Sequence, residues 1–147
     1  MMPIETGLGP GSGPRAPEDG KVDEALPAHP LILAVDDEPD MLLALELYLS
    51  GEGFEVMTAP NVHHALRRIE DHRPALILTD YIMPGVSGLE LCRTLRGRRE
   101  TRTIPIIMHT GWDLWQDHPG LFDRLVFKPA ELDSLARLIR TLLAAAR

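Results

Sequence analysis

From Pro30 onward, short apolar runs alternate along the chain with segments whose apolar residues recur at helical spacing. The runs predict strands of a largely buried parallel sheet at 31–35, 54–59, 75–79, 104–109 and 125–127. The amphipathic segments predict helices in four places. The first begins at Pro39, the second follows a cap at Asn61, the third runs through 89–95, and the last extends over about 131–146. This alternation favours an α/β fold, an open parallel sheet with right-handed crossovers and helices on both faces.

The first 29 residues have a different composition. They hold five glycines, five prolines and few apolar residues. Few apolar side chains could therefore be buried to compensate the conformational entropy that this segment would lose on folding. We therefore expect a disordered, Gly/Pro-rich tail over 1–29 and a single domain over 30–147. A flexible extension is favoured over a binding segment.

Composition narrows the class of protein. The 147 residues carry a formal net charge of −7, which argues against a nucleic-acid binder that relies on phosphate contacts. Cys92 is the only cysteine, so an intrachain disulfide is excluded and a reducing compartment fits. No apolar run approaches the ~20 residues that span a bilayer, and the N-terminal residues contain no hydrophobic stretch that resembles a signal peptide. We expect a cytoplasmic protein without membrane insertion.

Polar residues stand at the carboxyl ends of four predicted strands. Asp36 and Asp37 follow the first strand, Asp80 the third, Thr110 the fourth and Lys128 the fifth. Ligands of open α/β sheets bind beyond the carboxyl ends of the strands, so these five side chains should converge. Each alone could cap a helix or form a turn, but that interpretation does not explain their joint placement.

The converging groups predict phosphoryl chemistry. Three clustered carboxylates repel one another unless a cation is present, and a site without histidine or cysteine implies a hard ion, Mg²⁺ with Mn²⁺ as an alternative. An ammonium and a hydroxyl beside the ion suit the oxygens of a transferring phosphoryl group. A carboxylate can act as the nucleophile in such a transfer and become an aspartyl-phosphate.

The chain resembles the response-regulator receiver family of two-component signalling over about 31–146. The resemblance rests on four motifs, LILAVDDEP from Leu31, LILTDYIMPG from Leu76 with GLEL from Gly88, PIIMHTG from Pro105, and FKP from Phe127. It implies a flavodoxin-like, doubly wound (βα)5 parallel sheet with strand order 2-1-3-4-5.

The resemblance also implies a role for each site residue. Asp80 would be the phosphoacceptor, and Mg²⁺ would be held by Asp36, Asp37, Asp80 and the backbone carbonyl of Ile82, with Asp37 the more direct ligand of the first pair. Thr110 and Lys128 would contact the phosphoryl group.

The family resemblance implies partners as well. The donor would be a sensor histidine kinase or a histidine phosphotransfer protein, and the signal would pass to a downstream partner protein. We expect a stand-alone receiver, because the chain ends soon after the last predicted helix. We also expect a monomer or a weak dimer. Such a domain catalyses its own phosphorylation and dephosphorylation, and is a signalling protein rather than an enzyme in the usual sense.

Two departures from the family pattern affect the expected switch. Leu125 stands where the family usually has an aromatic residue that couples to the threonine. The segment between Thr110 and Lys128 is about one helical turn shorter than is common, and contains Trp112 and Trp115, which predicts a short or irregular fourth helix. The alternative function is a degenerate receiver that binds partners without being phosphorylated, although all five site residues are present.

Other interpretations are weaker. A phosphatase of the haloacid-dehalogenase type needs a nucleophile on the first strand with an aspartate two residues later, and the adjacent Asp36 and Asp37 do not fit. A flavin-binding protein needs a phosphate-cradling loop where this chain has acidic residues. We expect His109 to be an ordinary strand residue facing away from Thr110, and Cys92 to pack as a small hydrophobe. The arginines at the end of the third predicted helix should interact favourably with the negative end of the helix dipole.

Overall fold

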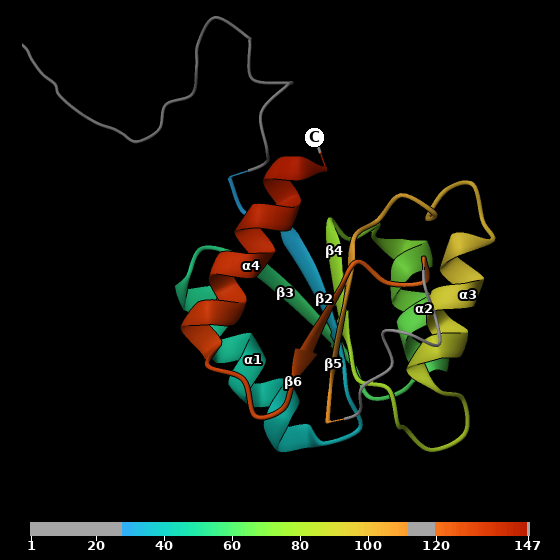
Figure 1. Cartoon of the computed structure of the whole chain (residues 1–147), viewed down its shortest axis with the longest axis horizontal. Coiled ribbons are helices and arrows are strands. Elements are labelled where there is room, and N and C mark those ends of the chain that lie inside the picture. Colours follow the sequence, from blue (N-terminus) through green and yellow to red (C-terminus); the bar gives the residue numbers. More distant parts are fainter. Residues whose placement is uncertain (1–27, 112–119, 147) are drawn as a thin grey trace, which may run out of the picture.

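A computed structural model describes residues 28–111 and 120–146 and contains a parallel sheet. Its five strands are β2 (Leu31–Val35), β3 (Glu55–Ala59), β4 (Leu76–Thr79), β5 (Ile106–Thr110) and β6 (Arg124–Phe127). They are arranged in the order β3-β2-β4-β5-β6 (Figure 1). In chain order this is 2-1-3-4-5, so the predicted doubly wound topology is confirmed.

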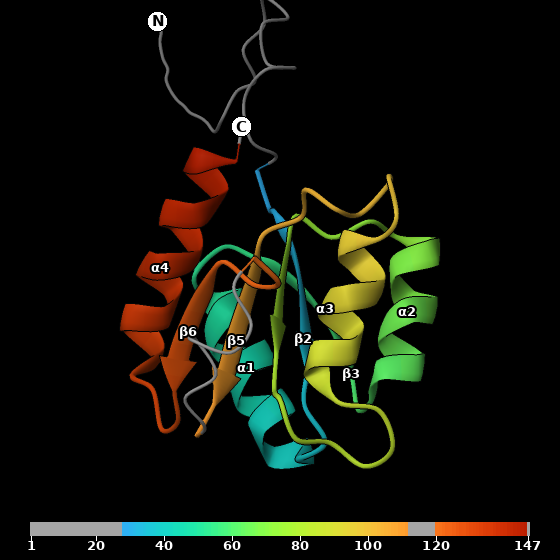
Figure 2. The same ribbon diagram turned by 45° about the vertical axis from the view of Figure 1, so that its right-hand side comes forward.

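Helices cover both faces of the sheet. In the described ranges they are α1 (Pro39–Gly51), α2 (Val62–Asp71), α3 (Gly88–Arg96) and α4 (Leu132–Ala145). Helices α1 and α4 lie on one face, and α2 and α3 lie on the other (Figures 1 and 2). The strands at the centre are therefore buried on both sides, which explains their uninterrupted apolar sequences.

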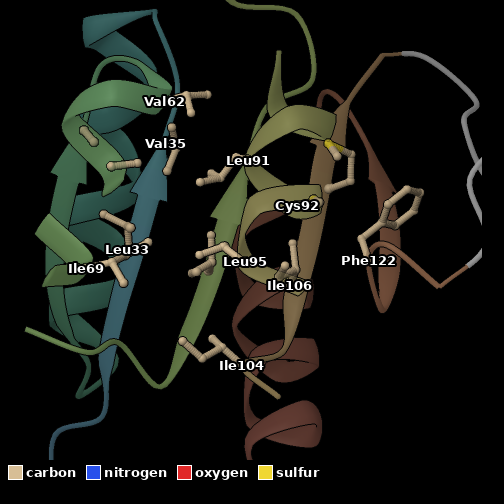
Figure 3. Packing of buried hydrophobic residues seen from close by; sticks show 14 of the residues in the cluster. Leu33, Val35, Val62, Ile69, Leu91, Cys92, Leu95, Ile104, Ile106 and Phe122 are labelled. Carbon is tan, nitrogen blue, oxygen red and sulfur yellow. The ribbon is translucent and has the colours of Figure 1, made fainter. Parts of the chain in front are cut away.

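Alternation along each strand divides the core into two clusters. On β2, Leu33 and Val35 face α2 and α3, whereas Ile32 and Ala34 face α1 and α4. Figure 3 shows the first cluster, in which Cys92 of α3 packs among apolar side chains. Burial raises the pKa of the Cys92 thiol to about 12, so this cysteine is an apolar packing residue, as predicted.

The helix boundaries follow local signals in the sequence. Asn61 caps α2, since its side-chain oxygen accepts a hydrogen bond from the backbone N–H of His64 at 2.9 Å. Pro39 begins α1, where its missing N–H costs no helical hydrogen bond. Gly53 adopts a φ of 97° just after α1, a conformation that favours glycine. These signals confirm the predicted start and end of α1 and the predicted start of α2.

The fourth strand begins later than the apolar pattern predicts. Ile104 is buried in the core but precedes β5, and Pro105 has no N–H for a strand ladder. The guanidinium of Arg96 donates a hydrogen bond to the backbone carbonyl of Ile104 at 2.8 Å, so this carbonyl bonds to a side chain and, in the described ranges, not to a neighbouring strand. Thr110, predicted to follow the strand, is its last residue.

Two predictions fall mainly outside the described residues. The tail was predicted over 1–29, of which the structure describes Ala28 and His29, and the short or irregular fourth helix falls on 112–119. His29 lies against the end of α1, where its Nδ1 is 3.1 Å from the backbone oxygen of Gly53. In the described ranges no helix is both long and apolar enough to cross a membrane.

Candidate phosphoacceptor site

The predicted polar residues converge at the carboxyl edge of the sheet. Asp36 and Asp80 directly follow the adjacent strands β2 and β4, which pair Val35 with Thr79 at their ends. Thr110 ends β5 and pairs with Phe127, the residue before Lys128. In Figure 2 this edge faces the loops that lead into α1 and α3. Parallel strands therefore bring together residues that are far apart in the sequence.

Lys128 connects two of the carboxylates. Its Nζ lies 2.8 Å from Oδ2 of Asp36 and 3.2 Å from Oδ2 of Asp80, and Oε1 of Glu38 is 3.7 Å away. Burial disfavours the ammonium, but the contacts with Asp36 and Asp80 outweigh burial and raise the pKa of Lys128. The lysine is therefore charged at neutral pH and neutralises part of the acidic cluster.

Asp36 and Asp37 differ in their surroundings although they are adjacent. Asp36 is only 2% exposed, and its Oδ1 accepts a hydrogen bond from the backbone N–H of Glu38 at 2.9 Å. Asp37 is exposed to solvent. Asp36 is thus held in place by Glu38 and Lys128, whereas Asp37 presents a carboxylate at the open side of the cluster.

Asp80, like Asp36, has a hydrogen-bond partner on each of its carboxylate oxygens. Its Oδ1 accepts a short hydrogen bond, 2.7 Å, from the backbone N–H of Tyr81, and its Oδ2 faces Lys128. Burial raises the pKa of Asp80 above its usual range, the Lys128 ammonium opposes this, and the Asp36 carboxylate adds to it. Both carboxylate oxygens therefore have defined directions, as a positioned nucleophile requires.

The carboxylates fit a hard divalent cation. One oxygen from each of Asp36, Asp37 and Asp80 can be chosen so that all three lie within 4.8 Å of one another. In the described ranges, Lys128 is the basic side chain that pairs with Asp36 and Asp80, and its single charge leaves the three acids with a net negative charge. Oxygen ligands at this spacing suit Mg²⁺. Ile82 lies in the loop after β4, and the role of its carbonyl as a ligand stays a prediction.

Thr110 lies at the end of β5 and Leu125 lies within β6, the fourth and fifth strands to which the sequence assigns them. Thr110 is buried, and its backbone carbonyl accepts a hydrogen bond from the N–H of Lys128 at 3.0 Å. Leu125 pairs with Met108 and packs partly buried against the core cluster beneath α2 and α3. Phe127, the aromatic residue of β6, is 51% exposed. The roles of Thr110 and Lys128 toward a phosphoryl group stay predictions.

Sequence reasoning missed several groups that shape the site. The side chain of Glu38 approaches Lys128, and the backbone N–H of Tyr81 holds Asp80. An acid directly after Asp36 and Asp37 was a signal for Glu38, but no sequence signal distinguishes one backbone N–H from another. His109, expected to be ordinary, is 2% exposed, and its Nε2 contacts no hydrogen-bond partner in the described part of the chain.

Comparison with known proteins identifies the family. The response regulator receiver domain matches residues 32–140. PilH of Pseudomonas aeruginosa is 32% identical over 118 residues, which cover 77% of this chain and 97% of that protein. The phosphate regulon transcriptional regulatory protein PhoB of Rhizobium meliloti is 46% identical over 81 residues, 55% of this chain and 36% of that protein. The chain spans about a third to a half of the length of several curated relatives.

Solved structures agree. The signal receiver domain of a signal transduction histidine kinase from Syntrophus aciditrophicus aligns with a TM-score of 0.74 and 31% identity, over 79% of this chain and 91% of that one. The response regulator TrrA of Thermotoga maritima, solved in complex with Mg²⁺-BeF, aligns with a TM-score of 0.69 and 31% identity, over 77% of this chain and 98% of that one. Fold, site geometry and sequence agree, and the chain belongs to the response regulator receiver domain family of two-component signalling.

Proposed function

We propose that this protein accepts a phosphoryl group on Asp80 from a phosphohistidine of a sensor histidine kinase or a histidine phosphotransfer protein. The observation that carries the proposal is the position of Lys128, whose Nζ lies between Oδ2 of Asp36 and Oδ2 of Asp80. A fixed ammonium beside a constrained carboxylate can stabilise the charge that develops on a transferring phosphoryl group.

The proposed transfer uses groups already at the site. A carboxylate oxygen of Asp80 attacks phosphorus, the phosphorus–nitrogen bond of the donor breaks, and the donor imidazole leaves with the bonding electrons. Lys128 and the hydroxyl of Thr110 would contact the phosphoryl oxygens. Asp36, Asp37, Asp80 and the carbonyl of Ile82 would hold Mg²⁺, which when bound neutralises negative charge on those oxygens.

Phosphorylation would change the local charge balance. A phosphoryl group on Asp80 adds negative charge and acceptor oxygens that compete with Asp36 for Lys128. The N–H of Lys128, the residue after β6, donates a hydrogen bond to the backbone carbonyl of Thr110 at the end of β5, so the two residues that would contact the phosphoryl group lie side by side. We infer that a downstream partner protein in the cytoplasm reads this shift. The receiver unit would comprise residues 30–147.

Intact mass spectrometry tests the assignment of the acceptor. The wild type, Asp80→Asn and the control Asp71→Asn, a surface acid on α2 with the same chemical change, are incubated with Mg²⁺ and acetyl phosphate. We expect one phosphoryl adduct on the wild type and on Asp71→Asn, and none on Asp80→Asn. A phosphoryl adduct on Asp80→Asn would show that another residue is the acceptor. Absence of labelling in all three, also with histidine-phosphorylated donors, would favour the phosphorylation-independent binding module.

A further inference from the structure

A buried threonine contacts the backbone of the acceptor. The hydroxyl of Thr79, the last residue of β4, donates a hydrogen bond to the backbone carbonyl oxygen of Asp80 at 3.0 Å. Thr79 has no exposed surface, and it shares the sheet face of Ile77, on which α2 and α3 lie. The hydroxyl therefore has a fixed environment and a single backbone group as its acceptor.

The first residue of α3 lies against the same carbonyl. A Cβ atom at Gly88 would overlap the carbonyl oxygen of Asp80 and come within 3.3 Å of the Thr79 hydroxyl. The N–H of Gly88 donates to the backbone carbonyl of Tyr81 at 2.8 Å, which closes the loop between β4 and α3. Glycine is required here by the close approach of two backbone segments.

These contacts act on one rigid group. The peptide that joins Asp80 to Tyr81 is planar, so its carbonyl and its N–H point in opposite directions and turn together. The carbonyl is held by Thr79 and Gly88 on one side. On the other side, the N–H donates to Oδ1 of Asp80 at 2.7 Å, while Oδ2 faces Lys128. A rotation of this peptide would therefore move the hydrogen bond that orients the acceptor carboxylate.

We propose that Thr79 and Gly88 are positioning residues that lock the Asp80–Tyr81 peptide and so aim the Tyr81 N–H at the acceptor carboxylate. The proposal rests on the proposed function for its effect on phosphoryl transfer, but its geometric part is independent of that function. Neither residue touches the phosphoryl group. Their effect is to reduce the number of orientations in which the carboxylate meets the donor.

Three variants separate positioning from general packing. Thr79→Val keeps the shape and removes the hydroxyl, Thr79→Ser restores a hydroxyl, and Gly88→Ala forces the carbonyl to move. Thr101→Val is the matched control, because the hydroxyl of the buried Thr101 donates to the backbone carbonyl of Leu95 at 2.7 Å, outside the acceptor site. The readouts are the phosphorylation rate at saturating Mg²⁺ and acetyl phosphate, and the nuclear magnetic resonance shift of the Tyr81 amide proton.

We expect Thr79→Val to slow phosphorylation about fivefold, the effect of one hydrogen bond, and to shift the Tyr81 amide proton upfield. Gly88→Ala should show larger changes of the same kind, Thr79→Ser should be close to the wild type, and Thr101→Val should change neither readout. A Thr79→Val protein with wild-type rate and amide shift would overturn the proposal, as would equal effects in Thr101→Val. If the wild type accepts no phosphoryl group, the proposed function fails and the amide shift alone decides whether the peptide is locked.

Discussion

The Nζ atom of Lys128 lies 2.8 Å from Oδ2 of Asp36, although 92 positions separate the two residues along the chain. The contact joins the loop after β6 to the end of β2, across the two strands that lie between them in the sheet. It neutralises an aspartate that is almost fully buried, and an unpaired charge at such a position is costly. The same lysine therefore serves both the stability of the acidic cluster and its proposed chemistry.

Removal of Lys128 should destabilise the fold and make it respond to magnesium. In Lys128→Met, Asp36 and Asp80 lose their cationic partner, and we expect the free energy of unfolding to fall by about 1–3 kcal/mol. Mg²⁺ should restore part of this loss, because a cation that binds the folded cluster and not the unfolded chain would stabilise the fold. Urea unfolding with and without Mg²⁺ measures both effects. Arg137→Met, which breaks an exposed pair with Asp133, is the control and should cost less than about 1 kcal/mol.

Asp37 should govern magnesium affinity with little effect on stability. Its carboxylate belongs to the oxygen cluster but is exposed, so Asp37→Asn removes a ligand and some repulsion without leaving a buried charge unpaired. We expect the Kd for Mg²⁺ to rise by about tenfold or more in calorimetric titration. Asp40→Asn makes the same charge change on the exposed start of α1, and its Kd should stay near the wild-type value. Equal Kd values for the two variants would remove Asp37 from the ligand set.

His109 should make stability fall as the solution becomes acidic. Burial, followed by the Lys128 ammonium, lowers its pKa from 6.5 to about 4, while Asp36 acts in the opposite direction. The unfolded chain therefore binds a proton at a higher pH than the folded protein, so stability present above pH 6.5 is lost between 6.5 and about 4. This difference corresponds to as much as about 3 kcal/mol at the acidic end.

His109→Leu isolates this contribution. The raised pKa of Asp80 works in the opposite sense, because the folded protein then retains a proton that the unfolded chain releases, so the difference between variant and wild type is the quantity to measure. Chemical unfolding at a series of pH values should give a flatter pH dependence for His109→Leu. His72→Gln, at an exposed position, should keep the wild-type curve. Parallel curves for His109→Leu and the wild type would contradict the assignment.

Arg96 should matter for stability far more than its arginine neighbours. Its guanidinium donates to Oδ2 of Asp123 at 2.9 Å and to the carbonyl of Ile104 at 2.8 Å, and the same Asp123 oxygen accepts from the N–H of Ile106. Arg96→Ala should lower the free energy of unfolding by about 2 kcal/mol or more. Arg93→Ala, which breaks an exposed pair with Glu90, should change it by less than about 1 kcal/mol. Urea unfolding measures both values, and equal losses of unfolding free energy in Arg96→Ala and Arg93→Ala would contradict this prediction.

The sequence was informative wherever the signal is local or repeats along the chain. Buried apolar runs marked the strands, Pro39 and Asn61 marked the helix starts, and the alternation of strand and helix predicted a parallel sheet. Parallel strands share one carboxyl edge, so the sequence alone places Asp36, Asp80 and Lys128 together. The confirmed fold shows that these simple rules hold for this chain.

The tertiary structure decided everything that depends on the distance between remote segments. The sequence places Asp36 and Asp37 at the end of the same strand, but only packing buries the first against Lys128 and leaves the second exposed. Packing likewise decided the partners of Arg96. It also decided that Gly88 lies against the carbonyl of Asp80. The physical reason is that hydrogen bonds and burial vary over fractions of an ångström to a few ångströms, whereas residue spacing along a chain determines only which strand end, helix turn or loop a side chain occupies.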